Sequence, residues 1–173
     1  IGFCLVGSEM CIRDSYITSP IITHFLYHVS LSPTHMVFMM QKEVADKILK
    51  KDGKNSVLSL MCELRCSKIR KVIDVSPGSF SPPPKVNSTV LLFEVRNQEW
   101  GMRNQKLIEL VKAGFTEKRK KLINNLRKYY PKTGDDRHET IDWENAFEQL
   151  WIDPNVRPEK VDLKVWQAMI EVI

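Results

Sequence analysis

The sequence predicts an α/β part followed by an all-α part. Three observations support this fold class. Residues 35–40 form a short apolar run bounded by breakers, which is typical of a buried strand. Residues 69–75 and 89–95 are rich in apolar and β-branched side chains, as strands are. From Asn104 onward every periodic segment has a helical period, so we place a boundary near residue 100.

The first element is predicted to be a helix that Ser19 caps, with Pro20 at its first position. Apolar residues then recur at helical spacing from Ile21 to Val29. The run at 35–40 is continuous rather than alternating, which favours a strand of a parallel sheet, buried on both faces.

Two helices are expected next, over residues 42–51 and 57–64. Val44, Ala45, Ile48 and Leu49 share one face of the first, and Asp52-Gly53 ends it. The second is expected to be capped near Asn55 or Ser56, since both side chains can accept a hydrogen bond from a free backbone N–H.

A proline-rich loop joins the strands at 69–75 and 89–95. It reads Ser76-Pro-Gly-Ser-Phe-Ser-Pro-Pro-Pro-Lys85, and three successive prolines restrict its conformations. Such a loop could present Phe80 to a nucleobase and Lys85 to a phosphate. The alternative is a structural loop with Phe80 in the core.

The second part is predicted to be helical over residues 104–115, 116–129, 142–150 and 162–172. Caps for the last three are available at Thr116, at Thr140 or Asp142, and at Asp162.

Charge is unevenly spread along the chain, although its net value is only +5. Residues 103–132 carry ten Lys and Arg against two Glu, whereas residues 133–173 carry four basic and ten acidic side chains. A concentrated cationic block is typical of a protein with a polyanion partner. A solvated helix face is the alternative interpretation.

Composition excludes several classes of protein. With 173 residues, 43% hydrophobic, 7 Gly and 4 Cys, the chain is neither collagen-like, disulfide-rich nor wholly disordered. No apolar run approaches the roughly 18 residues of a membrane span, so we expect a soluble, cytoplasmic protein. Cys62 and Cys66, like His24 and His28, are four residues apart, but zinc-site spacing is missing and we expect free thiols and no metal.

The first fifteen residues do not resemble the start of a domain. They begin with Ile1 rather than Met and have neither the basic region nor the apolar core of a signal peptide. Our hypothesis is that residues 1–15 are an artefactual leader, such as translated adapter sequence, and we exclude them from fold prediction.

Three motifs together carry a resemblance to a known family. They are Met40-Gln-Lys-Glu-Val-Ala45, Phe80-Ser-Pro-Pro-Pro-Lys-Val-Asn-Ser88 and Ile152-Asp-Pro-Asn-Val-Arg-Pro-Glu159. In order and spacing they resemble the bacterial small-subunit (16S) rRNA adenine N6,N6-dimethyltransferase family (KsgA), from about Ile17 to the end. Large-subunit rRNA methyltransferases share the proline loop, but the segment 152–159 favours the small-subunit branch.

The resemblance implies the C-terminal part of a Rossmann-like methyltransferase sheet over residues 16–100, and a helical RNA-binding domain over 101–173. It implies S-adenosyl-L-methionine as cofactor and dimethylation of N6 of two adjacent adenosines near the 3′ end of 16S rRNA. The implied partner is the 30S subunit, in ribosome biogenesis, with the protein a monomer that needs no metal.

The resemblance also implies roles for individual residues. Phe80 and Pro82 would line the pocket of the flipped adenine, and Lys85 would lie near the RNA backbone. Gln41 and Lys42 would line the active site, or simply start a helix. On a helix from Thr116, with Leu122, Ile123 and Leu126 buried, four side chains would face outward to RNA: Lys118, Arg119, Lys121 and Asn125.

The sequence departs from the family pattern at three places. The catalytic motif Asn-Leu-Pro-Tyr is missing, because residues 12–16 read Ile-Arg-Asp-Ser-Tyr before the matching Ile17-Thr-Ser-Pro20. The Gly-rich turn and the acidic ribose-binding residue of the cofactor half are absent, and Asn55-Ser-Val-Leu-Ser59 replaces Tyr-Gly-Arg-Leu-Ser. We therefore expect a truncated enzyme that is inactive alone. Alternatives are a non-catalytic rRNA-binding or ribosome-assembly module and a large-subunit rRNA adenine methyltransferase.

Overall fold

The computed structural model of the 173-residue chain describes residues 15–29, 33–96, 101–130 and 141–173. These residues fall into two compact units. Unit 1 lies within residues 1–52 and 61–98, and unit 2 within 53–60 and 99–173. Residues 1–14 of the hypothesised leader lie outside the described residues, and only its last residue, Ser15, is described.

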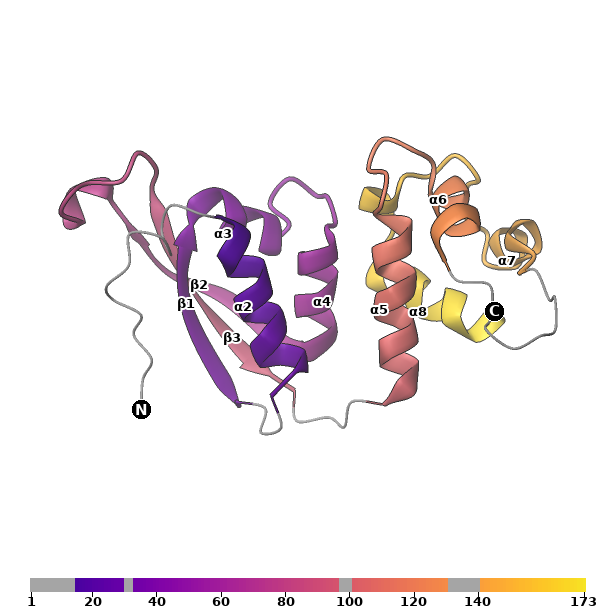
Figure 1. Ribbon diagram of the computed structural model, residues 1–173, viewed down its shortest axis with the longest axis horizontal. Coiled ribbons are helices and arrows are strands. Elements are labelled where there is room, and N and C mark those ends of the chain that lie inside the picture. Colours follow the sequence, from indigo (N-terminus) through magenta and orange to yellow (C-terminus); the bar gives the residue numbers. More distant parts are fainter. Residues whose placement is uncertain (1–14, 30–32, 97–100, 131–140) are drawn as a thin grey trace. The chain divides into compact units, whose positions relative to one another are not determined.

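Unit 1 consists of a small sheet with helices packed on it (Figure 1). Its elements are α2 (Ser15–Tyr27), β1 (His35–Gln41), α3 (Lys42–Ile48), the end of α4 (Val57–Arg65), β2 (Cys66–Val75), the 3-10 turn η1 (Pro77–Ser79) and β3 (Ser88–Val95). The predicted strands at 69–75 and 89–95 are confirmed as β2 and β3.

The described sheet is antiparallel throughout, in the order β1-β3-β2. The prediction that 35–40 is a doubly buried strand of a parallel sheet is wrong for these strands. β1 runs antiparallel to β3, and Met36 and Met40 are buried while Val37 and Met39 are exposed. Side chains alternate between the faces of a strand, and only one face of β1 packs on a core.

The core of unit 1 lies between that face and the helices. Leu91 and Phe93 of the central strand β3 are fully buried, as is Ile22 of α2. Arg65, at the end of α4, is also buried, and its Nε donates to the carbonyl of Leu26 at 3.0 Å. That hydrogen bond joins α4 to α2 and satisfies part of a buried guanidinium.

Helix α2 begins earlier than predicted. It starts at Ser15, so Pro20 lies within the helix rather than at its first position. A proline there removes one backbone hydrogen bond. Ile22 and Leu26, four residues apart, are both buried, and this packing sustains the helix in spite of the proline.

The start of α4 confirms the predicted cap, at Ser56. The backbone N–H of Ser59 donates to Ser56 Oγ at 3.1 Å, and the N–H of Ser56 donates to Ser59 Oγ at 2.8 Å. This reciprocal pair satisfies two free N–H groups of the first turn. Asn55 is buried instead, and its Nδ2 donates to the carbonyl of Val161 at 3.0 Å.

Unit 2 is helical, as the sequence predicts. Besides the segment 53–60 it contains α5 (Met102–Gly114), α6 (Leu122–Tyr129), α7 (Trp143–Gln149), the 3-10 turn η2 (Pro158–Lys160) and α8 (Leu163–Val172) (Figure 1). Asp142 caps α7 as predicted, because its Oδ1 accepts from the N–H of Asn145 at 3.0 Å. Among the described residues, no helix is long and apolar enough to cross a membrane.

A buried tryptophan organises the core of unit 2. Trp166 of α8 is fully buried, its ring stacks on Phe115 with centroids 6.0 Å apart, and its Nε1 donates to the carbonyl of Val161 at 3.1 Å. Leu110, Leu122 and Leu126 are also fully buried. The ends of α5 and α6 thus meet around one indole ring.

Candidate nucleic-acid interface

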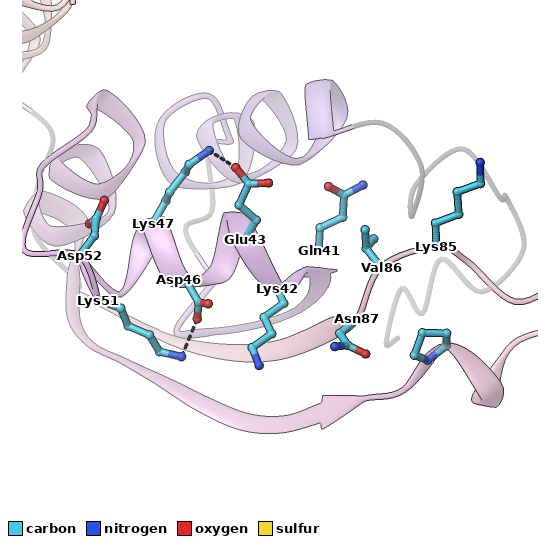
Figure 2. A pocket seen from close by; sticks show the side chains of 11 residues that line it. Gln41, Lys42, Glu43, Asp46, Lys47, Lys51, Asp52, Lys85, Val86 and Asn87 are labelled. Carbon is cyan, nitrogen blue, oxygen red and sulfur yellow. Dashed lines mark hydrogen bonds and ion pairs between the residues drawn. The ribbon is translucent and has the colours of Figure 1, made fainter.

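A groove of about 700 Å³ in unit 1 brings together residues that the sequence places far apart. Gln41 pairs with Ser88 at the end of β1, and the N–H of Lys42 donates to the carbonyl of Asn87 at 2.9 Å. This pairing fixes the start of α3 beside the end of the proline-rich loop. Gln41, Lys42 and Lys85 all line the groove (Figure 2).

The lysines of this groove fall into two groups. Lys47 pairs with Glu43 at 2.7 Å and Lys51 with Asp46 at 2.5 Å, as the dashed lines in Figure 2 show. Lys42 and Lys85 are exposed, and neither forms an ion pair within the described part of the chain. These two cations are therefore the ones open to a phosphate group.

Phe80 and Pro82 lie in the same loop but, in the described structure, do not line this groove. Phe80 follows η1, its N–H donating to the carbonyl of Pro77 at 3.2 Å, and its side chain is half-buried. Pro82 is exposed. The alternative interpretation of the loop placed Phe80 in the core, and the structure does not place it there. The role of Phe80 against an adenine stays a prediction.

The predicted helix over 116–129 begins only at Leu122, and residues 116–121 form a turn between α5 and α6. The turn exposes four consecutive cations, which we call the basic turn: Lys118, Arg119, Lys120 and Lys121. The first three line an open hollow of about 530 Å³. The sequence interpretation missed Lys120, because a helix would have turned it to a different face from its neighbours.

Glu117, the acid that directly precedes the basic turn in the sequence, is held by other groups. Glu117 Oε1 accepts from Lys128 Nζ at 2.9 Å and from the Tyr129 hydroxyl at 2.7 Å. These hydrogen bonds, with that from Lys128 the stronger cause, lower the pKa of the Glu117 carboxyl. Its negative charge is thereby compensated on the α6 side of the turn.

Asn125 does not face outward, and this expectation is wrong. It is 1% exposed, and its Nδ2 donates to the carbonyls of Gly114 at 2.5 Å and Glu117 at 3.1 Å. The first of these carbonyls lies at the end of α5, and the second opens the turn. The sequence spacing could have indicated this burial, because residue 125 lies on the same helical face as the buried Leu122.

The segment 152–159 supports the basic turn from the other side. Asn155 Oδ1 accepts from Lys121 Nζ at 2.6 Å, and the carbonyl of Val156 accepts from the N–H of Leu122 at 2.9 Å. Asp153 in turn accepts from the N–H of Asn155 at 2.8 Å. Residues of all three sequence motifs therefore lie at the two surfaces: motifs 40–45 and 80–88 at the groove of unit 1, and motif 152–159 at the basic turn.

Replacing Asn125 with Ala is expected to lower the free energy of unfolding by about 1–3 kcal/mol, since the buried hydrogen bond to the carbonyl of Gly114 is lost. The part-buried carbonyl of Glu117 keeps the N–H of Lys120 as its donor. RNA affinity should fall as well, although no charge is removed. Denaturant unfolding and RNA titration measure the two effects. Replacing Asn145, an exposed asparagine of α7 outside both surfaces, is the matched control, and an equal loss in both variants would contradict the role of Asn125.

The described residues offer no group of three or more metal-ligating side chains. Cys62 and Cys66 are free, buried thiols. Burial raises the pKa of the Cys66 thiol to about 11 and that of Cys62 further, so both are protonated at neutral pH. In the described part of the chain, the charged side chains that the two surfaces expose without an ion pair include the cations Lys42 and Lys85.

The family profile for ribosomal RNA adenine dimethylase matches residues 14–153. The chain belongs to this family. The resemblance drawn from the three sequence motifs is thus confirmed. The profile includes the proline-rich loop, the basic turn and the start of the segment 152–159.

Relatives within the family are named ribosomal RNA small subunit methyltransferase A. That of Malacoplasma penetrans is 36% identical over 155 residues, covering 88% of this chain and 53% of the relative. That of Prochlorococcus marinus strain AS9601 is 32% identical over 163 residues, covering 90% and 57%. The chain thus spans about half the length of the curated relatives it matches.

Solved structures share the methyltransferase fold with this chain. A dimethyladenosine transferase from Plasmodium falciparum matches with a TM-score of 0.68 at 24% identity, covering 88% of this chain and 61% of that protein. The 23S rRNA methyltransferase ErmE matches with a TM-score of 0.62 at 22% identity, covering 90% and 60%. At these identities the likeness concerns the fold.

Proposed function

We propose that this chain supplies the RNA-contacting part of an rRNA adenine dimethyltransferase that acts on the small ribosomal subunit. One observation carries the proposal. The basic turn presents four exposed cations on a backbone fixed by Asn125 and by the segment 152–159, in a member of the rRNA adenine dimethylase family. Fixed cations of this kind bind and position a phosphate backbone.

In this proposal residues 16–100 are the C-terminal part of a Rossmann-like methyltransferase domain, and residues 101–173 a helical RNA-binding domain. The substrate is N6 of two adjacent adenosines near the 3′ end of 16S rRNA, within the 30S subunit of the cytoplasm, and the protein acts as a monomer. The names of the relatives support the small-subunit assignment.

S-adenosyl-L-methionine is the expected methyl donor, but the described residues do not fit it. The strand-to-helix junction Gln41-Lys42 contains no glycine, and the described glycines lie elsewhere, at Gly53, Gly78, Gly101 and Gly114. A glycine-rich strand-to-helix turn is what lets a backbone approach such a cofactor closely. We therefore assign this chain no step of methyl transfer, and propose that the 173 residues by themselves are inactive.

What these residues do is hold RNA. The four cations of the basic turn, Lys118, Arg119, Lys120 and Lys121, contact phosphates from unit 2. Lys42 and Lys85 do so from the groove of unit 1. Phe80 and Pro82 form part of the wall against which the extruded target base rests, because a base must leave its stack before its N6 atom can react.

Replacing Lys118, Arg119 and Lys121 together with Ala is expected to flatten the salt dependence of RNA binding. Each phosphate contact contributes about 0.7 to the slope of log K against log salt for single-stranded RNA, so the slope should fall by about 2. Titrations of a 3′-terminal small-subunit rRNA fragment over a series of salt concentrations measure it.

A matched control removes the same charge elsewhere. Lys106, Lys160 and Lys164 are exposed lysines of unit 2 outside the basic turn. If their replacement flattens the slope equally, net charge rather than the turn governs binding, and the proposal fails. Footprinting on separated 30S and 50S particles tests the subunit, and protection on 50S alone would contradict the small-subunit assignment.

A further inference from the structure

Trp151 is the most exposed large apolar side chain of the described residues, at 95%. Its backbone has a φ of 54°, in the left-handed region that favours glycine. A bulky aromatic residue that is both solvated and conformationally unfavourable gains nothing from packing inside unit 2. Packing within the described residues therefore does not account for a tryptophan side chain at this position.

The backbone around Trp151 shows why the left-handed conformation is needed. The N–H of Trp151 donates to the carbonyl of Glu148 at 3.1 Å, and that of Ile152 to the carbonyl of Phe147 at 2.9 Å. These two bonds close the end of α7 in a Schellman motif, in which glycine is the usual residue at the left-handed position. The motif thus sets the direction in which the indole projects.

The indole forms one wall of an open groove of about 860 Å³ in unit 2. Its lining contains apolar side chains, among them Ile152 and Pro154, together with the polar side chains of Lys121 and Asn124. Lys121 belongs to the basic turn, so the groove continues directly from the proposed phosphate-binding surface.

The acids of this groove are mostly engaged within the protein. Glu144 forms an ion pair with Arg127, and Asp153 accepts from Asn155. Glu148 is the remaining acid of the lining, and its side chain forms no ion pair among the described residues. The groove thus has a partly apolar lining that includes one cation of the basic turn, Lys121.

We propose that Trp151 stacks on an unpaired base of RNA whose backbone phosphates lie on the basic turn. An indole offers a flat apolar face to any base, while Lys121 and Asn124 can contact the sugar and phosphate beside it. The inference rests on the proposed function, since it places a second contact of the same RNA in unit 2.

The test compares Trp151→Gly with Trp151→Phe in the protein. Glycine suits the backbone at this position, so the first variant keeps the fold, while phenylalanine keeps a stacking face. Affinity for a short single-stranded RNA should fall by about 5- to 100-fold in Trp151→Gly and be largely retained in Trp151→Phe. Affinity for a duplex of the same strand should not change.

The salt dependence separates this inference from the proposed function. Stacking releases no counterions, so Trp151→Gly should leave the slope of log K against log salt unchanged, whereas the basic-turn variant flattens it. Glu148→Gln should raise single-strand affinity, because it removes a negative charge near the RNA. A basic protein partner would instead bind this variant more weakly.

Equal single-strand affinity of Trp151→Gly and the native protein would overturn the stacking role while leaving the proposed function standing. An intact RNA affinity in Trp151→Gly with loss of a ribosomal protein from the complex would assign the groove to a protein partner and overturn it too. If the native protein binds no RNA, both proposals fall.

Discussion

Replacing Trp166 with Ala is expected to lower the free energy of unfolding by about 3–5 kcal/mol, the range measured for large aromatic side chains removed from a core. The indole is fully buried and stacks on Phe115, and its Nε1 donates to the carbonyl of Val161 at 3.1 Å. Alanine leaves a cavity and removes one of the two side-chain donors to the carbonyl of Val161, which keeps Asn55 Nδ2. Both losses fall on the junction of α5, α6 and α8.

Chemical denaturation monitored by circular dichroism measures this loss in the free energy of unfolding. The control is replacement of Lys164, an exposed residue of the same helix, with Ala. The control should stay within about 0.5 kcal/mol of the native protein. Trp166→Phe should fall between the two, because it keeps the stack but loses the N–H donor. A cost of less than about 1 kcal/mol for Trp166→Ala would contradict the central place given to the indole.

The elements that sequence periodicity predicts well are those whose burial follows from local pattern. β3, α5, α7 and α8 fall close to their predicted ranges, since each has an apolar stripe of the right period. β2 is the exception: it falls close to its range because β-branched residues favour a strand, although most of its side chains are exposed. The direction of β1 was not predictable in this way. Whether a strand pairs parallel or antiparallel depends on which distant segment lies beside it, here residues 88–94.

The start of α6 shows how tertiary contacts override helix propensity. Residues 117–121 read Glu-Lys-Arg-Lys-Lys, all good helix formers, yet they form a turn. The side chain of Asn125 binds the carbonyls of Gly114 and Glu117, and the N–H of Leu122 binds Val156. Partners so distant in sequence leave no mark on the local pattern.

For the candidate site, the sequence indicated the exposed cations correctly where exposure alone decides, as at Lys85, Lys118 and Arg119. It failed at Asn125, where a polar residue lies on a buried face, and it passed over Trp151. A tryptophan after a predicted helix carries no periodic signal. Only the left-handed backbone and the 95% exposure distinguish it.

Gly114→Ala is expected to destabilise the protein by about 3 kcal/mol, at the upper end of the cost of overpacking a core. A Cβ at this position would overlap Trp166 Cη2 and lie 2.8 Å from Leu122 Cδ1. Gly114 is at the end of α5, and its carbonyl accepts from Asn125. Any shift that relieves the overlap therefore moves the basic turn, and RNA affinity should fall together with stability.

A double-mutant cycle with Trp166→Phe tests the cause. Phenylalanine lacks the Cη2 atom, so Gly114→Ala should cost at least about 1 kcal/mol less in that background than in the native protein. Gly78→Ala is the matched control, because a Cβ there meets nothing within 4 Å. Additivity within about 0.5 kcal/mol would show that the indole is not what excludes a side chain at 114. A coupling energy of at least about 1 kcal/mol between the two substitutions would show that the close approach of α5 to Trp166 sets the path of the chain into the basic turn.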